Sequence, residues 1–126
     1  MSYAVYTIDG DIRWVSDSLP DLGTAIEYSI IECADGLNPD NYWVNVGVVQ
    51  KRTAFPRPNE SVIPTLEGFD ITITAIPHGT SVVWPDNFET LENDGRLVCS
   101  VTLETRYRFL FEHAAHFPRE VIIDVR

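Results

Sequence analysis

The grouping of apolar residues along the chain restricts the fold more than any other feature. Nearly every apolar run is short, rich in Val, Ile, Tyr and Trp, and bounded by Gly, Pro, Asn or Asp, whereas apolar residues at helical spacing are hard to find. Short runs of this composition, with apolar and polar residues in alternation, are typical of β-strands. The chain of 126 residues therefore predicts an all-β fold, as one domain or as two very small ones.

Residues 1–54 predict a small N-terminal unit that is rich in β-hairpins. Its strands are expected over residues 3–8, 12–16, 27–33 and 42–50. The first two of these strands form the clearest hairpin, because Asp9-Gly10-Asp11 between them suits the positive φ angles of a tight turn. Residues 17–26 have room for one helical turn.

A cluster of prolines follows this unit. Pro56, Pro58 and Pro64 each favour extended geometry in the preceding residue, and none of them has an N–H to donate to a neighbouring strand. We therefore interpret residues 55–68 as an extended linker.

Residues 69–126 alternate more regularly and predict a small β-sandwich. Tyr107, Phe109 and Phe111 fall on one face of a strand, and charged residues fall on the other face. Two more strands show one apolar face each, formed by Leu97, Cys99, Val101 and Leu103 in one and by Val121, Ile123 and Val125 in the other. Two sheets could bury these faces against each other.

The remaining strands and turns of this unit are set by turn residues. Strands are expected over residues 71–76 and 80–84 and near Glu89. The turns Pro77-His78-Gly79 and Asn93-Asp94-Gly95 are expected to form its hairpins.

The C-terminal pattern resembles a known domain type. The turn Pro77-His78-Gly79 leads into a strand, a late strand contains Tyr107, and Phe117–Val121 opens the last strand. In this order the segments resemble the PEGA-type and carboxypeptidase-regulatory-type sandwiches, over roughly residues 69–125. The resemblance implies an immunoglobulin-like (Ig-like) β-sandwich.

A second resemblance spans most of the chain. A small set of segments resembles the small accessory proteins of tailed bacteriophages: the Tyr-rich strand at residues 3–6, the segments at residues 42–45 and 48–52, and Phe55-Pro56-Arg57-Pro58. In those proteins a hairpin-rich head, an Arg-Pro linker and an Ig-like domain recur together. The resemblance implies a structural protein of the virion, associated with the tail, the tail tip or fibre attachment, with a capsid decoration protein as the alternative. Its partners would be other virion proteins, in a homo- or hetero-oligomeric assembly.

Net charge and the length of the apolar runs exclude two classes of partner. Nine basic and nineteen acidic residues give a formal charge of −10, and an acidic chain repels the phosphate backbone of a nucleic acid. No run approaches the ~18 apolar residues that a membrane-spanning helix needs, and the first residues do not resemble a signal peptide. We therefore expect neither nucleic acid nor membrane as a partner, and maturation in a cytoplasm. The phage resemblance implies that this is the cytoplasm of a host bacterium, where the protein is made before it joins the virion.

The residue types that carry chemistry show no recognisable motif. His113 and His116 could face one metal ion only from a loop, and the Asp9 region lacks the Gly and Glu that a calcium loop has at its sixth and twelfth positions. Cys33 and Cys99 are interpreted as reduced thiols, and neither has a histidine nearby in the sequence. We therefore expect no catalytic residue, no metal and no cofactor, and a protein that is not an enzyme.

Aromatic residues at expected strand ends and in the linker are the candidate binding residues. Rings on loops often anchor a partner, and an extended proline segment can lie in a groove or add to a sheet. The expected interface comprises Phe55, Pro56, Arg57, Pro58, Trp84, Asn87, Phe88, His116 and Phe117. A glycan of a host surface, bound through Trp84 and Phe88, is the alternative ligand.

Overall fold

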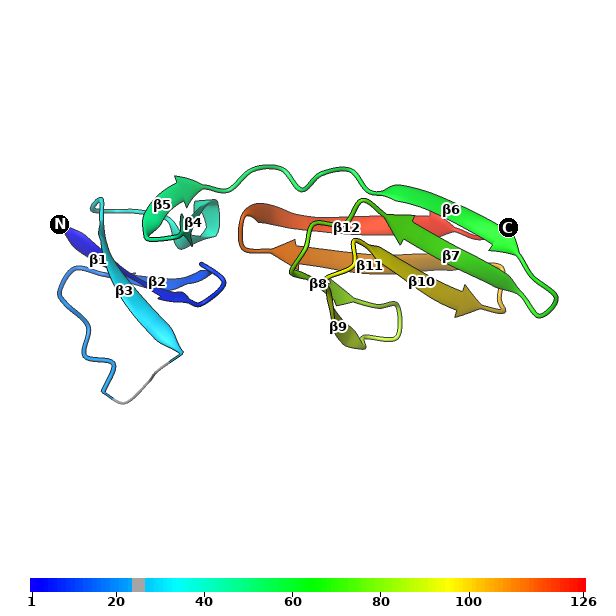
Figure 1. Cartoon of the computed structure of the whole chain (residues 1–126), viewed down its shortest axis with the longest axis horizontal. Coiled ribbons are helices and arrows are strands. Elements are labelled where there is room, and N and C mark those ends of the chain that lie inside the picture. The colour runs from blue at the N-terminus through cyan, green and yellow to red at the C-terminus, as the bar shows by residue number, and fades with distance from the viewer. Residues whose placement is uncertain (24–26) are drawn as a thin grey trace. The chain divides into compact units, whose positions relative to one another are not determined.

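The computed structural model describes residues 1–23 and 27–126 and divides them into two compact units (Figure 1). The first unit contains Met1–Ala54 and Ala114–Phe117, and the second contains Phe55–His113 and Pro118–Arg126. Among the described residues the regular elements are β-strands and one short 3-10 helix, η1 (Pro39–Asn41), so the all-β prediction is confirmed. Residues 17–23 contain no helix, and residues 24–26 of the expected helical turn lie outside the described residues.

The first unit is built on a three-stranded antiparallel sheet. Its central strand β1 (Ser2–Thr7) pairs with β2 (Ile12–Ser16) on one side and with β3 (Tyr28–Cys33) on the other. The first hairpin is therefore confirmed, and its turn contains Gly10 at a φ of 90°. Ala4 of β1 and Ile12 of β2 are buried and form an apolar core together with Val44.

The prediction of a single strand over residues 42–50 is wrong, because this segment forms a hairpin of two strands. The chain runs through β4 (Tyr42–Asn45), reverses, and returns as β5 (Val48–Lys51). The two turn residues Val46 and Gly47 have φ angles of 47° and 76°, which is the pattern of a type I′ turn. Valine is disfavoured at positive φ, so the sequence pattern does not indicate a turn there.

The second unit is a pair of antiparallel sheets. Its strands are β6 (Asn59–Pro64), β7 (Phe69–Thr74), β8 (Thr80–Val83), β9 (Glu89–Glu92), β10 (Arg96–Val101), β11 (Arg106–His113) and β12 (His116–Asp124). The first two residues of β12 are grouped with the first unit. One sheet has the order β10-β7-β6 and the other the order β12-β11-β8-β9.

The two sheets of the second unit share one apolar core. Ile71 and Ile73 of β7 are fully buried, as are Phe109 and Phe111 of β11 in the other sheet. The alternation predicted for β11 and for the last strand is confirmed, because the members named for each are buried or half-buried. The apolar face predicted for β10 does not extend to Leu103. β10 ends at Val101, and the Leu103 side chain is 68% exposed in the segment that follows.

Residues 55–68 are not a linker along their whole length. Asn59–Pro64 form β6, which pairs with β7 from Asn59 opposite Thr74 to Pro64 opposite Phe69. β6 is an edge strand, and the outward side of an edge strand tolerates a residue that has no N–H donor. Pro64 lies at the end of this edge strand, whereas Pro56 and Pro58 precede it, and all three prolines belong to the second unit.

The two expected hairpin turns of the second unit connect different sheets. Pro77–Gly79 joins β7 to β8, and Asn93–Gly95 joins β9 to β10. Turn residues show where a chain can reverse, but they do not determine which strand pairs with which.

Candidate interaction surface

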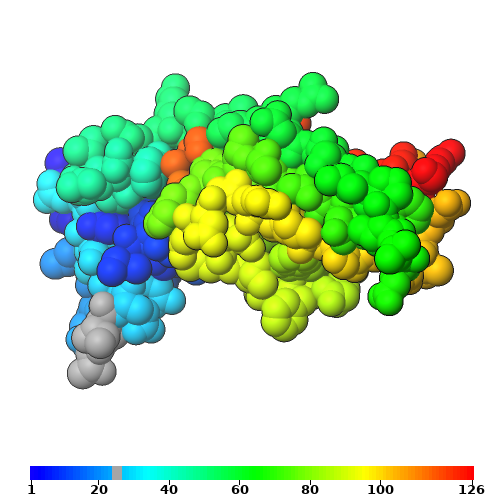
Figure 2. Space-filling model, turned by 45° about the vertical axis from the view of Figure 1, so that its right-hand side comes forward, coloured from blue at the N-terminus to red at the C-terminus, as the bar shows by residue number. Residues whose placement is uncertain are grey.

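The loop between β8 and β9 presents an exposed aromatic ring from an ordered turn. Phe88 is 65% exposed, and in Figure 2 the yellow-green β8–β9 hairpin projects from the second unit. The Trp84 N–H donates to the Phe88 carbonyl at 2.8 Å, and the Asn87 N–H donates to the Trp84 carbonyl at 2.8 Å. The Asp86 carboxylate accepts from the Phe88 N–H at 3.1 Å. The loop therefore holds the Phe88 backbone from both sides.

Trp84 fixes the base of this loop instead of facing solvent. Its indole Nε1 donates to the Thr90 hydroxyl at 2.7 Å, and its ring meets Phe109 edge-on with centroids 5.8 Å apart. The side chain is half-buried. Trp84 thus orients the turn, and Phe88 is the aromatic residue that the loop exposes.

The surroundings of the loop are acidic. Asp86 and Glu89 flank Phe88 in the sequence and are exposed. Burial raises the pKa of the Cys99 thiol, and the Asp86 charge raises it further. Cys99 is therefore an uncharged thiol at neutral pH. The charged residues nearest to Phe88 in the sequence are both acidic.

The proline segment at the start of the second unit differs from its expected role. Phe55 is only 4% exposed and stacks on Phe111 with centroids 5.7 Å apart, and its carbonyl accepts from the Arg119 guanidinium at 3.3 Å. Pro58 is buried as well, whereas Pro56 and Arg57 are exposed. Since the Phe55 ring fills the core, it is not available to anchor a partner.

His116 and Phe117 belong to the first unit. The Thr53 N–H donates to the Ala115 carbonyl at 3.0 Å, and the Phe117 N–H donates to the Thr53 carbonyl at 2.9 Å. The Thr53 hydroxyl also bonds to His116 Nδ1 at 2.9 Å. The Phe117 side chain is 39% exposed, so it can still contribute to a surface, while the His116 ring serves local structure.

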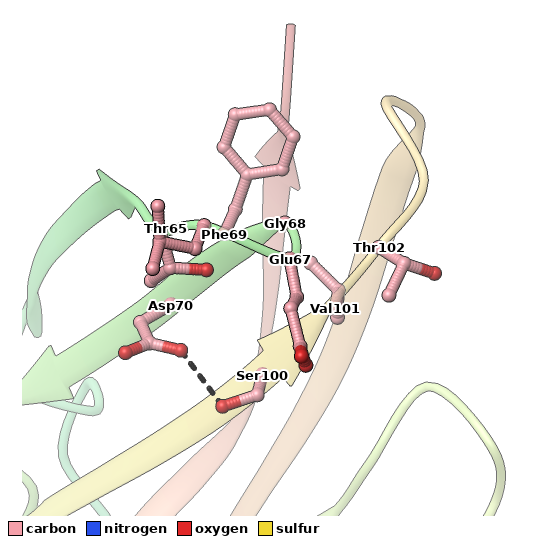
Figure 3. Close-up of a pocket in the computed structure, with 9 residues that line it drawn as sticks. Thr65, Glu67, Gly68, Phe69, Asp70, Ser100, Val101 and Thr102 are labelled. Atoms are coloured by element: carbon pink, nitrogen blue, oxygen red, sulfur yellow. Dashed lines mark hydrogen bonds between the residues drawn. The ribbon is translucent and has the colours of Figure 1, made fainter.

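A surface hollow lies at the end of the second unit where the β6–β7 turn meets the end of β10. It has a volume of about 590 Å³. Figure 3 shows residues that line it. The Asp70 carboxylate accepts from the Ser100 hydroxyl at 2.7 Å, as the dashed line shows. A Cβ on Gly68 would lie 2.1 Å from the Val101 carbonyl oxygen, so glycine is required for this close approach.

The sequence does not predict two exposed apolar residues near these features. Leu66 is fully exposed in the turn beside the hollow, and Leu91 of β9 is 63% exposed. Leu66 lies inside the segment interpreted as a linker, where an apolar residue between Thr65 and Glu67 was the available signal. Leu91 could be found only once β9 and its outward face were known.

The side chains considered as possible metal ligands do not come together in one site among the described residues. His113 Nε2 bonds to the His78 carbonyl at 2.9 Å. Within residues 1–23 and 27–126, no group of three or more His, Cys, Asp or Glu side chains is placed to hold a metal ion. The same described residues include no helix long and apolar enough to cross a membrane.

Comparison with family models, with curated proteins and with solved structures gives no match to this chain.

Proposed function

We propose that this protein acts by non-catalytic binding to other proteins, as a structural subunit of a tailed-bacteriophage virion associated with the tail, the tail tip or fibre attachment. The observation that carries the binding role is Phe88, which is 65% exposed on a turn held by backbone hydrogen bonds. The virion setting comes from the resemblance carried by the N-terminal strands and the Arg-Pro segment.

An exposed ring on a fixed turn suits protein binding for an energetic reason. Burying a side chain such as Phe stabilises a complex by about 1.5–3 kcal/mol, and this gain is reduced when a loop must be ordered on binding. The Asp86 and Trp84 hydrogen bonds order this loop in advance. Phe88 can therefore act as an anchor with little loss of conformational entropy.

The fold expected for the second unit supports the same proposal. We infer that this unit is of the immunoglobulin type, because its three-stranded and four-stranded sheets have the orders β10-β7-β6 and β12-β11-β8-β9. In addition, the Tyr107 hydroxyl at the start of β11 donates to the Leu103 carbonyl at 2.8 Å. A tyrosine at this corner, bonded to the backbone a few residues upstream, is a hallmark of such sandwiches.

Particle composition tests the proposal directly. Phage particles carrying the gene would be separated into tails and heads, and the chain located by mass spectrometry. We expect it in the tail fraction, with Phe88→Ser reducing its copies per particle by about tenfold, the effect of ~1.4 kcal/mol. Leu103→Ser, which alters another exposed apolar residue of the same unit, is the matched control.

Other distributions would contradict the proposal. Recovery with heads would indicate capsid decoration instead, and absence from particles would overturn the virion role. Binding of a host polysaccharide that is lost in Phe88→Ser, with normal particle content, would favour the glycan-binding alternative.

A further inference from the structure

Two turns of the first unit lie side by side and expose aliphatic side chains. The first is the β1–β2 turn, which contains Ile8, and the second is the β4–β5 turn, which contains Val46. Ile8 and Val46 are each 97% exposed, and Val48 beside the second turn is 54% exposed. We call these three residues and their two turns the aliphatic tip.

The backbone holds the two turns together. The Val44 N–H donates to the Gly10 carbonyl at 2.8 Å, and Asp11 forms an antiparallel bridge with Trp43. A Cβ on Gly10 would lie 2.0 Å from the Val44 carbonyl oxygen, so the contact depends on glycine. The tip is therefore built on fixed backbone.

An ion pair supports the same arrangement from beneath. The Arg52 guanidinium lies 2.7 Å from the Asp11 carboxylate, and its Nε donates to the Tyr42 carbonyl at 3.1 Å. Arg52 thus joins the first turn to the start of β4, and only 12% of its side chain is exposed.

Val46 is an unfavourable residue for its position in two ways. Its φ of 47° lies in the left-handed region, where a β-branched residue is strained and Asn or Gly is preferred. Its side chain is also almost wholly in water, so the fold gains no burial in return. Neither the turn nor the core explains valine here, and strain of this kind is concentrated at functional sites.

We propose that the aliphatic tip is a second docking element of this protein, which inserts Ile8 and Val46 into an apolar pocket bordered by Lys or Arg on another virion protein. The proposal rests on the virion role proposed above. It is separate from Phe88, which belongs to the second unit.

Charge determines the kind of partner. Asp9 lies next to Ile8, and neither turn contains a basic residue. The segment Met1–Ala54 carries eight acidic and three basic residues, so it attracts a basic border and repels an acidic one. A second copy of this chain fits poorly, because it would bring together two acidic surfaces, each of which presents the same protruding tip.

The substitution Val46→Asn separates binding from folding. Asparagine followed by glycine is the preferred pair for this turn, and Gly47 is already in place, so the variant should unfold at a higher temperature than the wild type. If the tip docks, the same variant should lose about tenfold in copies per particle when it competes with the wild type, which corresponds to ~1.4 kcal/mol. A merely structural role for Val46 predicts that incorporation stays the same or improves.

Photocrosslinking in the assembled particle identifies the partner. A benzophenone amino acid would be placed at position 8 or 46 and, as the control, at position 103 of the second unit. We expect positions 8 and 46 to crosslink to one and the same virion protein, near Lys or Arg residues, and position 103 not to reach that site.

Each outcome decides between the two proposals. If wild-type chain is present in particles and Val46→Asn is incorporated equally well, the docking role of the tip is wrong while the virion role stands. Crosslinks from positions 8 and 46 to another copy of this chain would also overturn it. If the wild-type chain is absent from particles, the virion role fails and the tip proposal fails with it.

Discussion

At the scale of single residues, steric fit decides which positions accept substitution. Gly10 and Gly36 both have positive φ angles, of 90° and 74°. A Cβ on Gly10 would overlap the Val44 carbonyl, whereas a Cβ on Gly36 would meet nothing within 4 Å. The two glycines therefore separate the cost of backbone conformation from the cost of a close approach.

We expect Gly10→Ala to destabilise the protein by about 2 kcal/mol or more, since a strained conformation and a steric overlap add together. Gly36→Ala should cost only about 1 kcal/mol, from backbone conformation alone. Urea unfolding of the two variants measures both values. Equal losses would show that the turn next to β4 can shift to make room.

Phe55 provides a second comparison of neighbouring residues. Because its ring is 4% exposed and stacked on Phe111, Phe55→Ala should lower the free energy of unfolding by about 3–5 kcal/mol. Arg57→Ala, at an exposed position two residues away, should change it by less than about 0.5 kcal/mol. Thermal unfolding checks this difference, and a small effect of Phe55→Ala would place its ring outside the core.

At the scale of elements, connections and edges decide how the strands are used. The β10–β11 connection is held by the hydrogen bond from the Tyr107 hydroxyl to the Leu103 carbonyl. The β11 and β12 strands are joined across their outer face by two ion pairs, Arg106 with Asp124 at 2.8 Å and Arg108 with Glu120 at 2.9 Å. Exposed pairs of this kind contribute little each, so most of the energy lies in the buried faces.

Tyr107→Phe tests the corner. The variant keeps the ring but removes the hydroxyl donor, and we expect a loss of about 1 kcal/mol in the free energy of unfolding. Urea denaturation with an unchanged dependence on urea concentration would show that the native fold is kept. No loss would mean that the hydrogen bond is replaced by one to water.

Acid unfolding tests the Arg106–Asp124 pair. The hydrogen bond from Arg106 lowers the pKa of Asp124 below its ordinary 3.8. Since the folded carboxylate binds its proton less readily than the unfolded one, the pair stabilises the fold above about pH 4 and this contribution is lost as the pH falls further. Asp124→Asn should therefore show a smaller loss of stability between about pH 5 and pH 2, measured by thermal unfolding. An identical pH profile in both proteins would contradict this expectation.

At the scale of the whole molecule, charge opposes compactness. The formal charge is −10, and like charges repel one another more strongly in the folded chain than in the expanded one. Salt screens this repulsion, and it also weakens exposed ion pairs, which contribute only about 0–1 kcal/mol each. The repulsion should dominate this balance.

We therefore expect the unfolding temperature to rise when sodium chloride is increased from about 20 mM to about 200 mM. Over this range the Debye length, the distance over which charges are screened, shortens to roughly 7 Å. Differential scanning calorimetry at constant pH measures the shift. A fall over the same range would show that ion pairs outweigh the net charge.

The sequence by itself determined the class of fold and many of its strands. Period-two alternation places Phe109 and Phe111 on one face, and Asp9-Gly10-Asp11 indicates the first hairpin, because both signals are local and need no knowledge of the partner strand. It also indicated Phe88 as an exposed loop residue, from its position at a strand end.

Only the tertiary structure decided which segments lie next to each other. It placed β6 at a sheet edge where a linker was expected, buried Phe55 against Phe111, and put Val46 in a turn. These outcomes depend on contacts between residues far apart in the chain. Such contacts can outweigh the local conformational preference of a residue, which is worth only ~1 kcal/mol. For this reason the pattern of apolar and polar residues identified many of the strands, while tertiary packing decided which strands pair and which residues stay exposed to solvent.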